Sequence, residues 1–191
     1  MRFVLRLLMS IVVALCVGFG LSYYALTDGR LFGAVTLGPW TTWPDIGAPA
    51  PNPYTNGHIA REAAFQLGRS EGLRFVATTD SDGAPLDLSC SYRLDGHVPV
   101  STFWTLVAVD GDWVNLAAPG TDAALRSSEV IRTEDGAMRV HVGTQLRPGT
   151  WMELAGSGPF SLALTLYDTT ALSSFASANT TMPSIAREAC S

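Results

Sequence analysis

The sequence predicts a mainly β protein, an antiparallel sandwich or barrel with one short helix, preceded by a single N-terminal membrane helix. Four Asp-Gly pairs, beginning at Asp82, Asp95, Asp110 and Asp135, separate runs of β-branched and aromatic residues. An Asp-Gly pair between apolar runs is the strongest short-range signal for a β-hairpin. Short strands divided by such turns are typical of sandwiches and barrels. The stretch Leu7–Leu26 carries no charge and matches the roughly 20 residues that cross a bilayer.

The membrane segment follows Arg2 and Arg6 and ends near Tyr23 and Tyr24, where the aromatic belt of a membrane interface belongs. A cleaved signal peptide has a shorter apolar region, of about 7–15 residues, and a small-x-small cleavage site. This segment offers no convincing site of that kind. We therefore expect an uncleaved helix over residues 1–27, with the N-terminus cytoplasmic and the remaining chain outside. A cleaved signal peptide is the alternative.

Residues 28–56 are rich in proline and glycine, which interrupt both helices and central strands. This composition predicts a linker arm with little regular structure. Trp40 and Trp43 could stack on a sugar or rest at the membrane surface, but we favour the interpretation that they pin the arm to its own domain. The segment His58–Gly68 has the apolar spacing of a short helix, with Asn56 as its N-cap and the final glycine as its stop signal.

The β-rich runs follow the helix, and residues 57–191 form the predicted sandwich domain. The run that ends at Val109 is nearly continuous in apolar residues, which predicts a strand covered on both faces at the centre of the sandwich. Beyond Thr169 we expect a mostly irregular tail. The expected strands are Leu73–Thr79, Ser89–Leu94, Val98–Val109, Trp113–Leu116, Val130–Ile131, Ala137–Val142, Trp151–Leu154 and Phe160–Tyr167.

Three cysteines fit an exported domain behind a membrane helix. Cys16 lies in the membrane segment, where it acts as a small apolar residue. Cys90 and Cys190 lie in the exported part, and an oxidising compartment favours disulfides. We therefore expect a bridge between these two, with two separate reduced thiols as the alternative. Closing a loop of that size stabilises by up to about 4–5 kcal/mol in the chain-entropy model.

Composition and motifs exclude several classes of function. The formal net charge of -5, without Lys or Arg runs after the N-terminus, argues against nucleic-acid binding. The acidic segment Asp80–Asp87 lacks the spacing of an EF-hand calcium loop, so we interpret it as a β-turn. His58, His97 and His141 are scattered, and no pair has the spacing of a helical metal site. The sequence therefore predicts no catalytic residue, no metal ligand and no cofactor.

A pocket lined by aromatic residues and a few polar groups is the default site for a small ligand. If the sandwich holds one, we expect it between the helix and the sheet that contains Trp104. Its polar members would be Arg93, His97 and Glu153. Aromatic residues in strands usually fill a core instead, so a plain packed interior is the competing interpretation.

A series of short motifs runs in order from residue 37 to residue 190. They include Leu37-Gly-Pro-Trp40, Asn52-Pro-Tyr54, Asp80-Ser-Asp-Gly-Ala-Pro-Leu86, Cys90-Ser-Tyr92, Phe103-Trp104-Thr-Leu106, Thr150-Trp151, Gly158-Pro-Phe160 and Pro183-Ser-Ile185. In these motifs the chain resembles the family called domain of unknown function 1214, in its short, membrane-anchored bacterial form. The resemblance implies a jelly-roll-like β-sandwich. It also implies a companion protein that carries the domain of unknown function 1254, and it supplies no catalytic residues.

Two hypotheses for function follow. The first is a non-enzymatic envelope protein, anchored in the bacterial inner membrane by its N-terminal helix, whose β-sandwich binds a partner protein at the periplasmic face. The second is an enzyme, or a small-ligand or carbohydrate-binding domain, with a pocket in the sandwich. Clustering of the predicted pocket residues around a cavity would favour the second. A broad apolar patch on an outer sheet face would favour the first.

Overall fold

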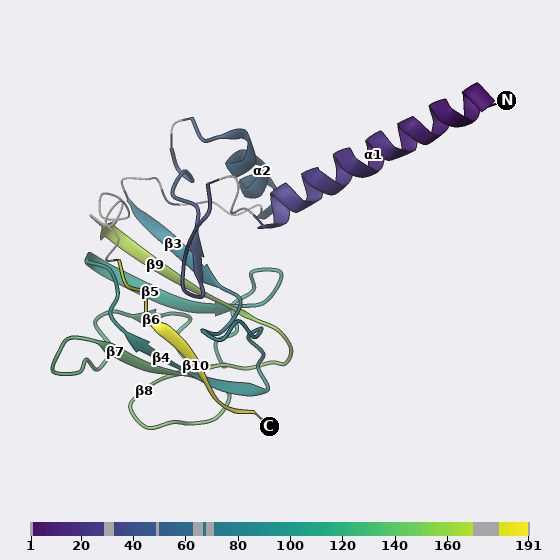
Figure 1. Ribbon diagram of the computed structural model, residues 1–191. Helices are drawn as coiled ribbons and strands as arrows, with labels where there is room; N and C mark the ends of the chain where they lie inside the picture. Colours follow the sequence, from purple (N-terminus) through teal and green to yellow (C-terminus); the bar gives the residue numbers. More distant parts are fainter. Residues whose placement is uncertain are drawn as a thin grey trace.

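The molecule consists of a long N-terminal helix and a body of two β-sheets with a short helix beside them (Figure 1). The computed structural model describes residues 2–28, 33–48, 50–62, 67, 71–169 and 180–190. The helices are α1 (Arg2–Asp28) and α2 (Pro53–Glu62). The strands are β1 (Val35–Leu37), β2 (Trp40–Thr42), β3 (Gly72–Ala77), β4 (Cys90–Gly96), β5 (Ser101–Val109), β6 (Leu125–Arg126), β7 (Met138–Gly143), β8 (Thr150–Glu153), β9 (Ser161–Thr169) and β10 (Ser184–Cys190).

The described strands form a six-stranded sheet in the order β1-β2-β3-β9-β5-β6 and a four-stranded sheet in the order β10-β4-β7-β8. The prediction of a mainly β chain behind an apolar N-terminal helix is confirmed. Strands β7 and β8 run parallel, which corrects the expectation of purely antiparallel sheets. Strand β8 begins at Thr150, which pairs with Val140, and Val140 lies three residues, about 10 Å, before the end of β7 at Gly143. The chain therefore has to run back by only about that distance between the two strands. The connection, residues 144–149, can span about 20 Å when extended.

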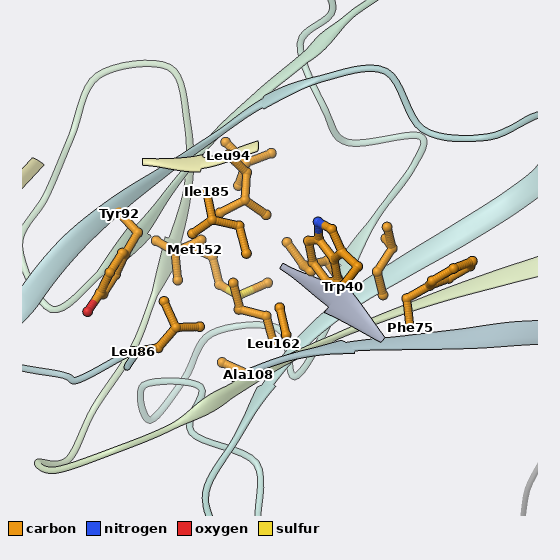
Figure 2. Packing of buried hydrophobic residues seen from close by; sticks show 14 of the residues in the cluster. Trp40, Phe75, Leu86, Tyr92, Leu94, Ala108, Met152, Leu162 and Ile185 are labelled. Atoms are coloured by element: carbon orange, nitrogen blue, oxygen red, sulfur yellow. The ribbon is translucent and has the colours of Figure 1, made fainter. Parts of the chain in front are cut away.

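The inner faces of the two sheets share one hydrophobic core, and Figure 2 shows side chains from both sheets directed toward one another. Leu106 of β5 and Leu164 of β9 are fully buried on one side, and Tyr92 and Val140 are fully buried on the other. Side chains alternate between the two faces of a strand, so every second residue of these strands reaches the core. Burial of one such side chain stabilises the fold by about 1.5–3 kcal/mol.

Helix α1 extends away from the sheets (Figure 1). Its segment Arg2–Tyr24 has a mean hydropathy of 2.4, and none of the most apolar window is buried. A helix that is apolar on all sides needs an apolar environment around it. By length and composition α1 can cross a membrane, a property that an N-terminal signal sequence shares.

Residues 28–56, predicted to be a linker with little regular structure, contain two strands. β1 and β2 pair around Gly38, whose φ of 59° suits a tight turn, and β2 pairs with β3. Trp40 is fully buried, and its indole N–H donates to the carbonyl of Pro183 at 2.7 Å. The interpretation that Trp40 pins this arm to its own domain is confirmed. The proline-rich composition predicted no strands here, but β2 forms because it pairs with β3. Prolines beside an edge strand do not prevent this pairing.

Helix α2 begins at Pro53 rather than at His58. Asn52 is its N-cap, because the Asn52 side-chain oxygen accepts the backbone N–H of Thr55 at 2.9 Å. Proline suits the first helical position, where its missing N–H has no partner to lose. The predicted cap, Asn56, therefore lies inside the helix. The predicted end of the helix lies outside the described residues.

Strand β5 was predicted to be covered on both faces at the centre of the fold. Its burial alternates instead: Trp104, Leu106 and Ala108 are buried, while Phe103 and Val107 are half-buried. Its partner β9 lies between β3 and β5 and is the more central strand. The apolar residues of β5 therefore supply one core face and one outer face.

The turn after β5 prevents the expected second hairpin strand, Trp113–Leu116. The Asp110 carboxylate accepts the backbone N–H groups of Asp112 and Val114, both at 2.9 Å. Trp113 takes a left-handed φ of 62°. A bulky residue adopts that conformation only when its surroundings hold it there. The chain beyond this turn makes isolated β-bridges in place of a strand.

The tail beyond Thr169, predicted to be irregular, ends in strand β10. Residues 170–179 lie outside the described residues, and β10 pairs antiparallel with β4. Ile185 is 1% exposed and belongs to the core. The predicted disulfide between Cys90 and Cys190 is confirmed, and it joins residues 100 positions apart. The C-terminal strand is thus held by pairing, by core burial and by a covalent bond.

Candidate functional site

The outer face of the four-stranded sheet carries a cluster of polar side chains, which we call the polar face. Along β4 and β7, residues such as Leu94 and Val140 point into the core, so their neighbours point outward. The polar face consists of Arg93, Asp95, Arg139, His141, Trp151, Glu153 and Glu188. It is built from all four strands of this sheet.

Three nitrogen-bearing side chains form a row across the polar face. Arg93 in β4 is opposite His141 in β7, and His141 is opposite Trp151 in β8. Neighbouring strands lie about 4.8 Å apart, so the three Cα positions span about 10 Å. The register therefore brings together residues that are far apart in the sequence. At the other end of this row stands Ala186 of β10, opposite Arg93.

A β-bulge in β10 adds a carboxylate to this row. The register shifts between Arg187 and Ala189, so Glu188 is turned toward the polar face. One Glu188 oxygen lies 3.2 Å from Nη1 of Arg93. The other lies 3.2 Å from Nδ1 of His141. A single carboxylate from the C-terminal strand thus orients both side chains.

A second carboxylate completes the ionic network. Asp95 lies 2.9 Å from Nη2 of Arg139 and 3.8 Å from Nε of Arg93. The Arg93 and Arg139 side chains are 42% and 54% exposed, and pairs this exposed each contribute about 0–1 kcal/mol. The two arginines offset Asp95 and Glu188, and Glu153 leaves the polar face with one negative charge in excess.

Three side-chain N–H donors of the four-stranded sheet and its β7–β8 connection make no hydrogen bond among the described residues, although one of them, Nε of Arg93, lies 3.8 Å from Asp95. They are Nε of Arg93, Nε of Arg147 in the β7–β8 connection, and Nε1 of Trp151. Each of these atoms is shielded from solvent. Such a donor left unpaired costs about 1–3 kcal/mol, and buried polar groups nearly always find a partner. All three atoms are donors, so the group that would satisfy them is an acceptor.

Arg187 anchors β10 on the side of the sheet opposite Glu188. Its Nε lies 3.3 Å from a carboxylate oxygen of Asp80, its Nη2 donates to the carbonyl of Pro85 at 2.7 Å, and its guanidinium lies 5.7 Å from the ring centroid of Tyr92. The other Asp80 oxygen accepts backbone N–H groups of residues 82 and 84, which confirms the β-turn predicted there. These contacts and the disulfide hold the bulged strand in register.

The outer face of the six-stranded sheet is different, and we call it the apolar face. Its apolar residues are Val76, Phe103, Val107, Ala163 and Tyr167, which are buried or half-buried within the chain. One polar row crosses between them and consists of Arg74, Thr165, Thr105 and Arg126. Ala163 pairs with Val76 on one side and with Val107 on the other, and the rings of Phe103 and Tyr167 lie 5.8 Å apart. An antiparallel sheet that faces water normally alternates apolar-in with polar-out. This sheet keeps apolar residues on its outer side as well.

The turn at residue 113 contacts an arginine in the polar row that crosses the apolar face. The Arg74 guanidinium lies 5.6 Å from the ring centroid of Trp113. Arg74 pairs with Thr165, which is 6% exposed, in the middle of the sheet. The left-handed φ of Trp113 thus accompanies a cation–π contact in which the indole ring covers the Arg74 guanidinium.

The four residues predicted to line a pocket do not share one cavity. Trp104 is 2% exposed and belongs to the core between the sheets. Arg93 and Glu153 lie on the polar face, in adjacent cross-strand rows. His97 is exposed, and its Nε2 lies 3.1 Å from the backbone oxygen of Asp135. The structure therefore places Arg93 and Glu153 on the same sheet face, with strand β7 between them, and separates both from Trp104.

Asp135 and Asp87 carry the clearest electrostatic shifts near the ends of this sheet. A hydrogen bond from the Thr133 hydroxyl lowers the pKa of Asp135, and His97 adds a smaller favourable charge. Hydrogen bonds from Ser89 lower the pKa of Asp87. Asp135 is an exposed turn residue and Asp87 is a half-buried residue in a β-bridge with Pro159, and both shifts arise from hydrogen bonds to neighbouring side chains.

Sequence reasoning missed the grouping of His141, Trp151 and Glu188. The alternation in β7, Met-Arg-Val-His-Val, places Arg139 and His141 on one face. Which residues of β4, β8 and β10 join them depends on strand order and on the bulge, neither of which the sequence pattern specifies. Among the described residues, no group of three or more His, Cys, Asp or Glu side chains is arranged to hold a metal ion.

Comparison with solved structures finds related folds in longer proteins. The VPA0106 protein from Vibrio parahaemolyticus matches 74% of this chain with a TM-score of 0.59 at 17% sequence identity, and the match covers 36% of that protein. An uncharacterized protein from Burkholderia cenocepacia matches 90% of this chain with a TM-score of 0.49 at 15% identity, covering 40% of its own chain. This chain thus spans well under half the length of the solved proteins that it matches. The comparison with curated proteins gave no match.

The family comparison concerns the sheets and their connections. The model of the family described as "Protein of unknown function (DUF1214)" matches residues 71–171, which include strands β3 to β9. That match covers more than half of the 191 residues. The motifs between residues 80 and 167 that carry the resemblance lie within it. The chain therefore belongs to the DUF1214 family of proteins of unknown function.

Proposed function

We propose that the chain is a membrane-anchored, jelly-roll-like β-sandwich that binds a companion protein at the periplasmic face of a bacterial inner membrane. Helix α1 (Arg2–Asp28) crosses the bilayer once with the N-terminus in the cytoplasm. The role is non-enzymatic, and the companion is a protein that carries the domain of unknown function 1254. The observation that carries this proposal is the apolar face.

The apolar face has the composition of a surface that becomes covered. On either side of its one polar row, the strands place valine, alanine and aromatic side chains where an antiparallel sheet facing water would place polar ones. Tyrosine and phenylalanine are enriched in protein interfaces, while charged residues are depleted from interface cores. Of the two arginines in the polar row, Arg74 is stacked with Trp113, and Arg126 at the sheet edge is paired with Glu129. Together these features support docking of another protein on this side.

The comparison with a solved structure gives a second argument for a companion protein. In the VPA0106 protein the shared fold makes up only 36% of the chain, so it lies there within a much longer protein. A fold that occurs beside additional chain commonly buries part of its surface against that chain. We infer that the companion occupies the corresponding surface in this protein.

Two features support the proposed location. Arg2 and Arg6 precede the apolar helix, and positive residues favour the cytoplasmic side of a membrane. The bridge between Cys90 and Cys190 fits an oxidising compartment such as the periplasm. The pocket hypothesis, with Arg93, His97, Trp104 and Glu153 around one cavity, has no comparable support because the core and the polar face separate these residues.

Site-specific photo-cross-linking tests the proposal in the intact chain. A photoreactive amino acid replaces Val107 on the apolar face, and the control replaces Val100, an exposed valine in the β4–β5 connection. After irradiation of membranes, we expect position 107 to give one discrete heavier adduct that contains a protein with the domain of unknown function 1254. Position 100 should give none. Equal adducts from both positions, or no adduct from position 107, would contradict the proposal.

A further inference from the structure

We propose that the turn formed by residues 110–114 is a lid on the docking surface, and that the companion protein displaces this lid when it binds. We call the turn the Trp113 lid. In the free chain the indole ring of Trp113 covers the middle of the apolar face. This inference rests on the docking proposed above and adds a step to it, because a covered face has to be opened before a partner can pack on it.

Strand β9 is buried on both of its faces. Leu162, Leu164 and Leu166 are fully buried in the core between the sheets. The residues between them, Ala163 and Thr165, are only 5% and 6% exposed, although they point to the outer side. Alanine and threonine side chains are short, so neighbouring groups of the chain must shield both of them. The apolar face is therefore covered in part within the free chain.

The contact between the Trp113 lid and Arg74 passes over this strand. Val76, Ala163 and Val107 form one cross-strand row. Arg74 lies two residues before Val76, about 7 Å further from the end of β5 at which the lid begins. Its guanidinium nevertheless lies 5.6 Å from the ring centroid of Trp113. The two side chains therefore meet above the row that contains Ala163, which explains why this alanine is buried.

The base of the lid is fixed and its tip is strained. The backbone N–H of Asp110 donates to the carbonyl of Val114 at 3.0 Å, and the Asp110 carboxylate accepts two N–H groups of the turn. Between them Trp113 takes a φ of 62°, which is unfavourable for a bulky residue. This strain opposes the closed position, whereas the cation–π contact with Arg74 favours it. A partner that displaces the indole ring also relieves the strain, so opening requires little work.

A covered surface lowers the apparent affinity of its partner. When only a fraction of the chains has an open lid, the apparent Kd is the intrinsic Kd divided by that fraction. The closed lid also reduces the apolar surface that the free chain offers to other proteins. The Trp113 lid therefore favours a partner whose own apolar side chains replace the contacts of the indole ring, and it disfavours partners that cannot replace them.

Thiol labelling of the full-length chain in detergent micelles tests whether the lid covers the face. The reporter is Ala163→Cys in a Cys16→Ala background, so that the introduced thiol is the one free cysteine of the sequence. Trp113→Gly removes the ring but keeps the turn, because glycine adopts a positive φ without strain. We expect Trp113→Gly to make labelling by a small maleimide at least about tenfold faster, because the labelling rate of a covered thiol follows its local opening.

Three further variants make this test specific. Arg74→Gln removes the cation that holds the ring and should accelerate labelling about threefold or more. Val114→Ala changes a 59% exposed neighbour in the same turn and should leave the rate within about twofold. Leu106→Ala destabilises the core without touching the lid and should also stay within about twofold. No acceleration in Trp113→Gly, or equal acceleration in Val114→Ala or Leu106→Ala, would overturn the lid.

Photo-cross-linking at position 107 tests whether the lid acts on docking. In Trp113→Gly the adduct with the companion should form with at least about twice the wild-type yield, because more of the chains are open. Val114→Ala should leave the yield unchanged. An adduct that does not respond to Trp113→Gly would overturn the regulatory role of the lid and leave the docking surface in place. Absence of the adduct from every variant would overturn the docking itself, and the labelling rates would still decide whether Trp113 covers the face.

Discussion

The two sheets are alike on their inner faces and opposite on their outer faces. Inside, both supply alternating apolar residues to one core, as Leu106 and Val140 do. Outside, the six-stranded sheet shows Val107 and its neighbours, while the four-stranded sheet shows the ionic network around Glu188. The inner pattern is what any two-sheet fold requires. The outer patterns are not needed for folding, so the difference between them is the best guide to function.

The first way to test this comparison is to contrast neighbouring residues of β5 that point in opposite directions. Leu106→Ala removes a fully buried side chain and should lower the free energy of unfolding by about 2–5 kcal/mol. Val107→Ala, on the half-buried outer side, should lower it by less than about 1.5 kcal/mol. Urea unfolding of both variants measures the difference. Equal losses would mean that the outer side is packed as tightly as the core.

The second test removes the disulfide bond between Cys90 and Cys190, which ties strand β10 to strand β4. The double variant Cys90→Ala, Cys190→Ala opens a bridge between residues 100 positions apart and should destabilise the protein by about 2–4 kcal/mol. The single-site control Cys16→Ala lies in α1, outside the sheets. Urea unfolding under oxidising conditions should show a loss only in the double variant. An unchanged midpoint would show that strand pairing alone fixes β10.

A smaller effect is expected from the ionic network itself. Glu188→Gln keeps the shape of the side chain and removes the charge that faces Arg93 and His141. Because Arg93 is 42% exposed, the loss in stability should be about 1 kcal/mol or less. Thermal unfolding at low and high salt measures it, and salt should reduce the difference between variant and wild type. A loss as large as that of Leu106→Ala would contradict the assignment of this network to the surface.

The smallest expected effect is on the melting temperature at low pH. Asp87 and Asp135 have lowered pKa values because Ser89 and Thr133 donate hydrogen bonds to their ionised forms. A carboxylate with a lowered folded-state pKa contributes stability above its unfolded pKa, near 4, and that stability is lost as the pH falls through the folded value. Melting temperatures should therefore fall below about pH 4, and Asp135→Asn should reduce that fall slightly. A steeper fall in Asp135→Asn would contradict this account.

Much of the fold could be predicted from local patterns. Strands β3, β4, β7, β8 and β9 lie within a residue or two of the expected runs, because apolar alternation and Asp-Gly turns are local signals. The disulfide also followed from the compartment and the cysteine count. Strands β2 and β10 were missed, because they are stabilised by pairing with β3 and β4, which lie far away in the sequence. Trp40 reaches Pro183, for example, and no local pattern indicates that contact.

The polar face could be predicted only in part. Arg93 and Glu153 were recognised as polar strand residues, but the sequence could not show that Trp104 points into the core while Trp151 points outward. Both are tryptophans in β-rich runs, and only the register of each strand decides which face it occupies. Glu188 belongs to a bulge, and a bulge is not visible in an unaligned sequence.

The most direct measurement of the central claim is the size of the complex formed by the full-length chain in mild detergent extracts of its own membranes. Two variants are compared, Val107→Glu on the apolar face and Val100→Glu at an exposed valine outside it. Val100→Glu should unfold at nearly the wild-type temperature, whereas Val107→Glu, at a half-buried position, should unfold at a lower temperature but still cooperatively. We predict that Val100→Glu keeps the complex with its companion and that Val107→Glu runs as the chain alone, because a buried unpaired charge opposes docking. A complex of unchanged size in Val107→Glu would contradict the claim that the apolar face is the docking surface.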